Sequence, residues 1–149
     1  SAFINVTGDN GQWDPNVGAT TSGGTGPTAA QDGSFYYYTE TFGLNPGDTF
    51  DLEGDFDFSS LTNAEITFYR HMYSQFGDMG TLALDVSTNS GGAWTNVWSL
   101  TGDQGNVWTQ ETVNLSAYDG EASVRLRFRV TIGPSFRSEV GLDNLSIHG

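Results

Sequence analysis

The side chains that most often perform catalysis are scarce in this sequence. It contains no Cys and two His, His71 and His148, of which only His71 lies within an expected strand. A thiol nucleophile and thiolate metal ligands are therefore excluded, and no Gly-flanked Ser marks a hydrolase triad. Zinc is poorly served for the same reasons.

Paired carboxylates are the remaining catalytic chemistry, because a glycosidase needs only two of them. Glu53, Asp55 and Asp57 alternate along one segment and would share a face if that segment is extended. An exposed polar strand explains this spacing equally well. We predict that the protein is not an enzyme.

Aromatic and planar polar side chains offer binding chemistry instead. Sugar rings stack their C–H faces on aromatic rings, and polar neighbours fix their orientation. We expect the Tyr69 and His71 face of one strand to flank an arginine ladder on another, which would form a planar hydrogen-bonding platform. The arginines could equally balance neighbouring acidic residues. The candidate ligand-binding residues are Tyr69, His71, Arg127, Arg129, Trp13 and Phe136, of which the last two lie in polar, turn-rich segments and are expected to be exposed.

The charge balance is strongly acidic. The chain carries 18 Asp and Glu against 5 Arg, with a net charge of −13 at pH 7. Such a chain lacks the cations that neutralise phosphates, so we expect neither nucleic-acid binding nor attraction to an anionic membrane surface. No segment is long and apolar enough for membrane insertion.

The elements that must position these side chains are strands. The 20 Gly, with many Ser, Thr, Asn and Asp, place turn signals about every ten residues, which is typical of a sandwich or barrel. The clearest strand covers 123–132, where even positions are apolar and Arg125, Arg127 and Arg129 occupy odd positions. Further strands are expected at 3–6, 35–42, 49–52, 65–73, 81–88, 94–100, 109–115 and 140–147. So many strands in one domain, 1–149, must pack as two sheets, an antiparallel all-β sandwich.

The last expected strand breaks its own alternation. Val140 and Leu142 share one face, whereas Leu145 and Ile147 point to the other. A β-bulge near 143–144 is the simplest cause, and a bulge re-aims the side chain of Asp143.

The order of several short segments resembles the MAM domain family, whose animal members occur in meprins, neuropilins and receptor-type tyrosine phosphatases. The matching segments are Gly26-Pro27-Thr28, Asp32 to Tyr36, Ile66 to Tyr73, Met79 to Leu82, Asp85 to Ser87, Trp98, Gly102 to Gly105, Trp108, Val113 to Leu115, Val124 to Arg129 and Gly141 to Leu145.

This resemblance implies a jelly-roll sandwich without catalysis, acting in adhesion or substrate targeting. It is closest to the cysteine-free version appended to secreted bacterial proteases and polysaccharide-degrading enzymes. The disulfide cysteines of the animal members are absent, so their homophilic adhesion does not carry over safely. In the late Ala-Leu-Asp-Asp segment of the family, Asp143 matches and Asn144 replaces the second acid.

We further expect a structural calcium ion. The acidic excess and the phase break at Asp143 favour it, and the resemblance implies it, since jelly-roll modules often hold calcium between an early strand and the last one. The candidate ligands are Asp143, Asp32 and Glu40. Eight residues of strand span roughly 25 Å, so Asp32 and Glu40 cannot both lie near Asp143, and Asp32 is favoured.

The leading functional hypothesis is a non-catalytic carbohydrate-binding module of a secreted bacterial enzyme, binding a polysaccharide or cell-surface glycan. A protein-binding adhesion module and a calcium-stabilised structural spacer are the alternatives. We expect the chain to be secreted or at the cell surface, as a monomeric module of a larger protein.

Overall fold

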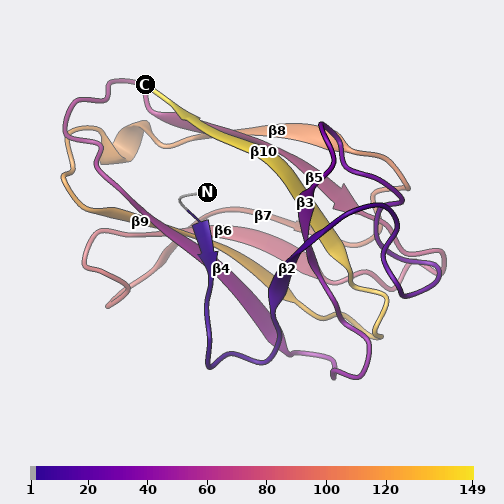
Figure 1. The fold of residues 1–149 in the computed structure, drawn as a ribbon. Helices are drawn as coiled ribbons and strands as arrows, with labels where there is room; N and C mark the ends of the chain where they lie inside the picture. The colour runs from indigo at the N-terminus through magenta and orange to yellow at the C-terminus, as the bar shows by residue number, and fades with distance from the viewer. Residues whose placement is uncertain (1–2) are drawn as a thin grey trace.

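The computed structural model describes residues 3–149 as an all-β fold with one short 3₁₀ helix (Figure 1). The strands are β1 (Phe3–Asn5), β2 (Trp13–Asn16), β3 (Tyr36–Thr39), β4 (Thr49–Phe56), β5 (Glu65–Met72), β6 (Thr81–Ser87), β7 (Thr95–Thr101), β8 (Thr109–Asn114), β9 (Val124–Thr131) and β10 (Val140–His148). The 3₁₀ helix η1 (Ser116–Tyr118) precedes β9.

These strands form two five-stranded antiparallel sheets. The first sheet has the order β1-β4-β9-β6-β7, and the second has the order β2-β3-β10-β5-β8. Figure 1 shows the two layers stacked, with β4, β9 and β6 in one and β8, β5 and β10 in the other. The predicted two-sheet sandwich of jelly-roll type is therefore confirmed.

Strand β9 shows which face of the first sheet is buried in the core. Its even-numbered residues, Leu126 and Phe128 among them, are fully buried, and its arginines lie on the outer face. The ring of Phe128 packs edge-on against Phe68 of the second sheet, with centroids 4.9 Å apart. Period-two alternation thus places one face of each sheet in a shared core, as predicted.

Two strands differ from the sequence expectation. Strand β2 was not predicted, because it is short and contains Pro15, which is tolerated only at a sheet edge. Strand β4 continues past residue 52 to Phe56, and its outward-facing Asp55 forms an ion pair with Arg125 (2.6 Å). The alternating acids of this segment therefore lie on a strand whose charge is partly balanced.

Strand β10 contains the predicted bulge. Asp143 pairs with Tyr69, whereas Ser146 pairs with Thr67, so β10 carries one extra residue between these pairs. Asn144 at the bulge has a left-handed φ of 55°. The extra residue restores the inward phase after Leu142, which explains why the apolar pattern shifts face in the sequence.

Candidate functional site

A cleft of about 450 Å³ opens between the two sheets beside the β10 bulge. It lies where β1 and β4, at the edge of the first sheet, face β2, β3 and β10 of the second. Its lining residues are Phe3, Pro15, Phe35, Tyr36, Tyr37, Phe56, Asp143, Asn144, Leu145, Ser146 and Ile147.

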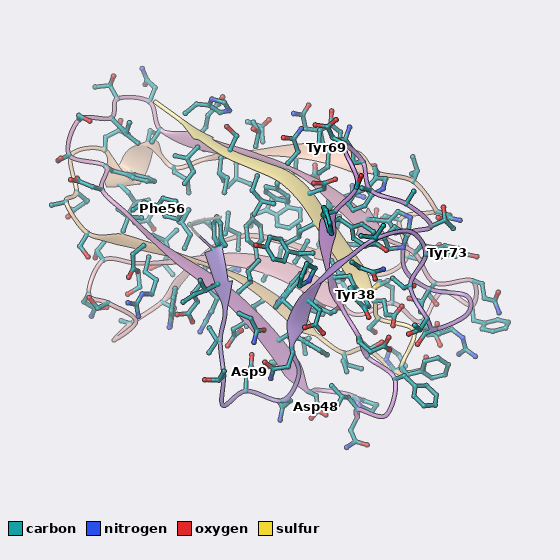
Figure 2. All side chains as sticks on the ribbon, in the orientation of Figure 1. Asp9, Tyr38, Asp48, Phe56, Tyr69 and Tyr73 are labelled. Carbon is teal, nitrogen blue, oxygen red and sulfur yellow. The ribbon has the colours of Figure 1, made fainter. Side chains whose placement is uncertain are left out.

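The cleft combines aromatic surface with a few polar groups. Phe35 is 66% exposed at its mouth, and the half-buried rings of Tyr37 and Phe56 pack against the core from either sheet. Figure 2 shows Phe56 between the two layers. The bulge supplies a carboxylate and an amide from Asp143 and Asn144. Such a site can stack the apolar face of a ring and hydrogen-bond to its hydroxyls.

Sequence reasoning missed the aromatic members of this cleft. The signal was present in the run 36–38, because alternate residues of a strand point to opposite faces. Tyr36 therefore faces outward, where its hydroxyl donates to the carbonyl of Gly18 (2.6 Å), and Tyr37 faces the cleft. That the first sheet leaves this edge open was not readable from the sequence.

Asp143 is held by backbone donors at the rim of the cleft. Its Oδ2 atom accepts the N–H groups of Gln31 and Asp32, both at 3.0 Å, and its Oδ1 accepts that of Asn144 at 2.8 Å. The structure thus brings Asp143 and the Asp32 backbone together, while Glu40 lies elsewhere. Across residues 3–149, no group of three or more His, Cys, Asp or Glu is arranged to hold a metal. A calcium ion at Asp32 and Asp143 stays a prediction.

Glu40 meets Glu139, a residue that sequence reasoning did not select. Strands β3 and β10 pair Tyr38 with Gly141, and the same register continued by two residues places Glu40 directly opposite Glu139. Glu139 is fully buried, and its backbone N–H donates to the hydroxyl of Thr25 (3.1 Å). Burial, and next the adjacent Glu40 carboxyl, raise the pKa of Glu139 to about 8.

Arg127 and Arg129 converge on a buried partner, Asp85 of β6. Their Nε atoms donate to Asp85 Oδ2 at 3.0 and 2.9 Å, and the Asp85 side chain is 2% exposed. The guanidinium of Arg127 also stacks 4.0 Å above the ring of Trp94. Burial raises the pKa of Asp85, but hydrogen bonds from Arg129, Asn96 and Arg127 lower it overall. The arginines therefore balance charge within the protein.

The predicted platform of arginines and β5 side chains is wrong. The arginines lie on the outer face of the first sheet, whereas Tyr69 and His71 belong to β5 of the second sheet. Figure 2 labels Tyr69 in the layer of the second sheet. Alternation assigns a residue to a strand face but does not say which sheet holds the strand. His71 is also covered: it is 2% exposed, its Nε2 donates to Asn106 Oδ1 (2.8 Å), and Trp108 packs 5.4 Å from its ring.

The two aromatic residues expected at the surface have different outcomes. Trp13 is 2% exposed and lies in the core, so its predicted exposure is wrong; as the first residue of the edge strand β2 it turns its ring inward. Phe136 is partly exposed. It packs edge-on against the exposed Phe42 (5.6 Å), and the guanidinium of Arg137 lies over the rings of both Phe136 and Phe76.

Comparisons with known proteins bear on this fold and site. The family model of the MAM domain, meprin/A5/mu, matches residues 2–149. MAM domain-containing glycosylphosphatidylinositol anchor protein 1 of Homo sapiens is 32% identical over 83 residues, which cover 55% of this chain and 8% of that protein. The chain therefore corresponds to less than a tenth of this relative's length. In the described part of the chain, no helix is long and apolar enough to cross a membrane.

Solved structures share the fold at low sequence identity. The K1 cleaved adhesin domain of Lys-gingipain from Porphyromonas gingivalis W83 has a TM-score of 0.66 at 20% identity, covering 99% of this chain and 89% of that one. TmCBM61 in complex with β-1,4-galactotriose has a TM-score of 0.58 at 14% identity, covering 95% and 88%.

A Stig cyclase, Fisc from Fischerella sp. TAU, has a TM-score of 0.60 at 14% identity, covering 98% and 83%. Adhesins, a carbohydrate-binding module and a cyclase thus use the same sandwich, so these likenesses show the fold alone. The family match, by contrast, extends over nearly every residue, and this chain belongs to the MAM domain family.

Proposed function

We propose that this domain is a non-catalytic glycan-binding module that holds a saccharide in the cleft beside the β10 bulge. The observation that carries the proposal is the cleft itself, where Phe35, Tyr37 and Phe56 offer ring surface next to the polar bulge. The carbohydrate-binding module among the structural neighbours supports this reading, since that protein binds a galactose trisaccharide on the same fold.

The cleft is better suited to binding than to catalysis. Its one carboxylate, Asp143, already accepts three backbone N–H groups, so both of its oxygens are engaged by the protein's own backbone. A glycosidase would need a second carboxyl group across the cleft. The residues that line it include no such partner in the described part of the chain.

The setting that we propose is a larger secreted or cell-surface protein in which this module is monomeric and directs a catalytic domain to polysaccharide. The match to only 8% of the length of a cell-surface relative fits a module within a long chain. The acidic surface disfavours nucleic acid and leaves uncharged or basic glycans as the ligands that suit the field of the protein.

Affinity electrophoresis on a panel of soluble plant and marine polysaccharides tests this proposal. Phe35→Ala should weaken binding by about 5- to 150-fold, the usual cost of truncating an aromatic contact. Phe76→Ala is the matched control, because its ring is 65% exposed, like that of Phe35, but lies outside the cleft. If no polysaccharide retards the wild type, or if both variants bind equally, the cleft is not a glycan site.

A protein-binding adhesion role is the second candidate, favoured by a different surface. The guanidinium of Arg137 lies over the rings of Phe76 and Phe136, and Phe42 packs edge-on against Phe136. Phe42 and Phe76 are 70% and 65% exposed. Exposed aromatic rings beside an arginine have the composition of a protein-binding hot spot. In that case Phe76→Ala, not Phe35→Ala, should abolish adhesion of beads coated with the domain to a bacterial or host-cell surface.

A further inference from the structure

The cleft beside the β10 bulge has an apolar inner wall. Five of its lining residues are buried or half-buried and belong to the core or pack against it; they are Phe3, Tyr37, Phe56, Leu145 and Ile147. Phe56 lies between the two layers of the sandwich (Figure 2). A group that reaches this wall therefore meets carbon atoms from both sheets, with the Tyr37 hydroxyl as the one polar side-chain group among the five residues.

Few other side chains of the cleft are available to hydrogen-bond to a sugar. Asp143 already accepts three backbone N–H groups, and the hydroxyl of Tyr36 donates to a backbone carbonyl (2.6 Å). Among residues 3–149, the polar side chains that line the cleft and make no such bond are Tyr37, Asn144 and Ser146. Because a hexose carries several hydroxyl groups, these side chains leave some of them without a protein partner.

The described lining of the cleft also contains no cation. The chain has no Lys, and none of its five Arg lines the cleft. Proteins recognise the carboxylate or sulfate groups of sugars mainly through such cations. The net charge of −13 adds a repulsive field. The cleft is therefore unsuited to uronic acids and sulfated sugars and suits neutral ones.

We propose that the cleft selects a neutral sugar that carries a methyl group and that this methyl group packs on the inner wall. The inference rests on the glycan-binding function proposed above and names the class of sugar. A hydroxyl placed against Leu145 and Ile147 would lose its water without gaining a partner, whereas a methyl group gains by leaving water. Two kinds of sugar offer this chemistry: a 6-deoxyhexose, and a sugar with an acetyl substituent.

The mouth of the cleft would hold the polar part of the same sugar. Phe35 is 66% exposed there and offers a ring face for stacking. Asn144 is also exposed, and its left-handed φ of 55° places it at the bulge, where its amide can donate and accept hydrogen bonds. A sugar oriented in this way has its hydroxyls toward water and its methyl group toward the core.

NMR titration of the isotope-labelled domain with matched methyl glycosides tests the inference. In two pairs, D-galactose with D-fucose and L-mannose with L-rhamnose, a methyl group replaces a hydroxymethyl group. In a third pair, D-glucose with N-acetyl-D-glucosamine, an acetamido group replaces a hydroxyl. In at least one pair the methyl-bearing member should bind about tenfold more tightly, the usual discrimination by one apolar group in a hydrophobic pocket. The pair that responds identifies the source of the methyl group.

Ile147→Thr should reduce this preference, because it places a hydroxyl on the inner wall as a partner for a sugar hydroxyl. Ile4→Thr is the matched control and should keep the preference, since Ile4 is 69% exposed and lies outside the cleft. The inference is overturned if both members of every pair bind equally, or if Ile147→Thr folds and keeps the full preference. The wild-type pairs decide it even where Ile147→Thr does not fold.

These failures are distinct from a failure of the proposed function. Retardation by polysaccharide and its loss in Phe35→Ala report on glycan binding itself, whatever the sugar carries. If polysaccharide retards the wild type and the pairs bind equally, the cleft binds glycan without selecting a methyl group. If no polysaccharide or glycoside binds, the proposed function fails and this inference fails with it.

Discussion

Each sheet carries a buried acid on its outer face, and the two acids have neighbours of opposite charge. On the first sheet, Asp85 is 2% exposed and receives Arg127 and Arg129. On the second sheet, Glu139 is equally buried, and its nearest charged neighbour is another acid, Glu40. Asp85 lies on β6 and Glu139 directly precedes β10, and the two residues are similarly buried.

The two buried acids differ in whether the chain supplies a group that compensates the charge of the carboxylate. Desolvating a carboxylate costs several kcal/mol unless a partner compensates it. At Asp85 the compensation is built into the chain, so that face needs no ligand. At Glu139 burial and the neighbouring acid disfavour the charged form, and the pKa of Glu139 is accordingly raised to about 8.

The largest expected effect comes from removing the compensated acid. Asp85→Ala should lower the free energy of unfolding by about 2–4 kcal/mol, because two guanidinium groups lose their shared partner. The value is set below that of a fully buried pair, since Arg127 and Arg129 are 18% and 31% exposed and can turn to water. Urea unfolding at neutral pH measures it, and a loss below 1 kcal/mol would mean that the arginines do not need Asp85.

The two faces should also respond to acid in different pH ranges. Burial lowers the pKa of His71 on the second sheet below its ordinary value of 6.5, so the folded state holds this ring neutral. The unfolded chain then binds the proton more readily, so the contribution of His71 to stability falls as the pH drops below 6.5. Glu139 acts in the opposite direction, because its raised pKa of about 8 makes the folded state bind its proton first. Asp85, whose pKa is also lowered, loses its stabilising charge only when the pH falls below its ordinary value of 3.8.

His71→Gln isolates the first of these ranges. The variant should remove the fall in stability that His71 contributes between about pH 7 and pH 5 and leave the opposite contribution of Glu139. Relative to the wild type, stability should therefore fall less, or rise, as the pH drops through this range, while the loss in stronger acid persists. Urea midpoints across this range provide the measurement. An unaltered slope would show that His71 is not the group that titrates.

The sequence predicts features that arise within a single strand, but it does not predict contacts between residues of different strands. The alternation of 123–132 predicted which residues of β9 are buried, and the phase break predicted the bulge beside Asp143. Both are properties of a single strand. Pairing between strands is not, so the same alternation placed Tyr69 and Arg129 together although they belong to different sheets.

The missed residues follow the same logic. Trp13 appeared exposed because its neighbours are polar, yet pairing with β3 turns its ring into the core. Glu139 precedes an expected strand and has no unusual spacing of its own. Its importance comes from the register that sets it opposite Glu40, which only the folded chain reveals.

A smaller effect is expected at the uncompensated acid. Glu139→Gln should leave the free energy of unfolding at neutral pH unchanged or raise it by up to about 1 kcal/mol. With its pKa raised to about 8, Glu139 is mostly protonated in the folded state at pH 7, and a neutral amide of equal size replaces it. The measurement is the urea unfolding used for Asp85→Ala. A loss above 1 kcal/mol would show that the protein itself compensates Glu139, and the contrast between the faces would disappear.

The smallest effect is expected at an ion pair that resembles the Asp85 cluster but is open to water. Arg125 belongs to the same ladder and contacts Asp55 at 2.6 Å, yet the Asp55 side chain is 69% exposed. Solvent screens such a pair, so Asp55→Ala should cost about 0.5 kcal/mol or less, and added salt should reduce this further. Measured beside Asp85→Ala, the variant separates burial from charge pairing, since both acids contact an arginine of β9. If the two variants reduce stability by the same amount, burial is not what makes the Asp85 cluster strong. The burial of Glu139 would then not distinguish it from an exposed acid either.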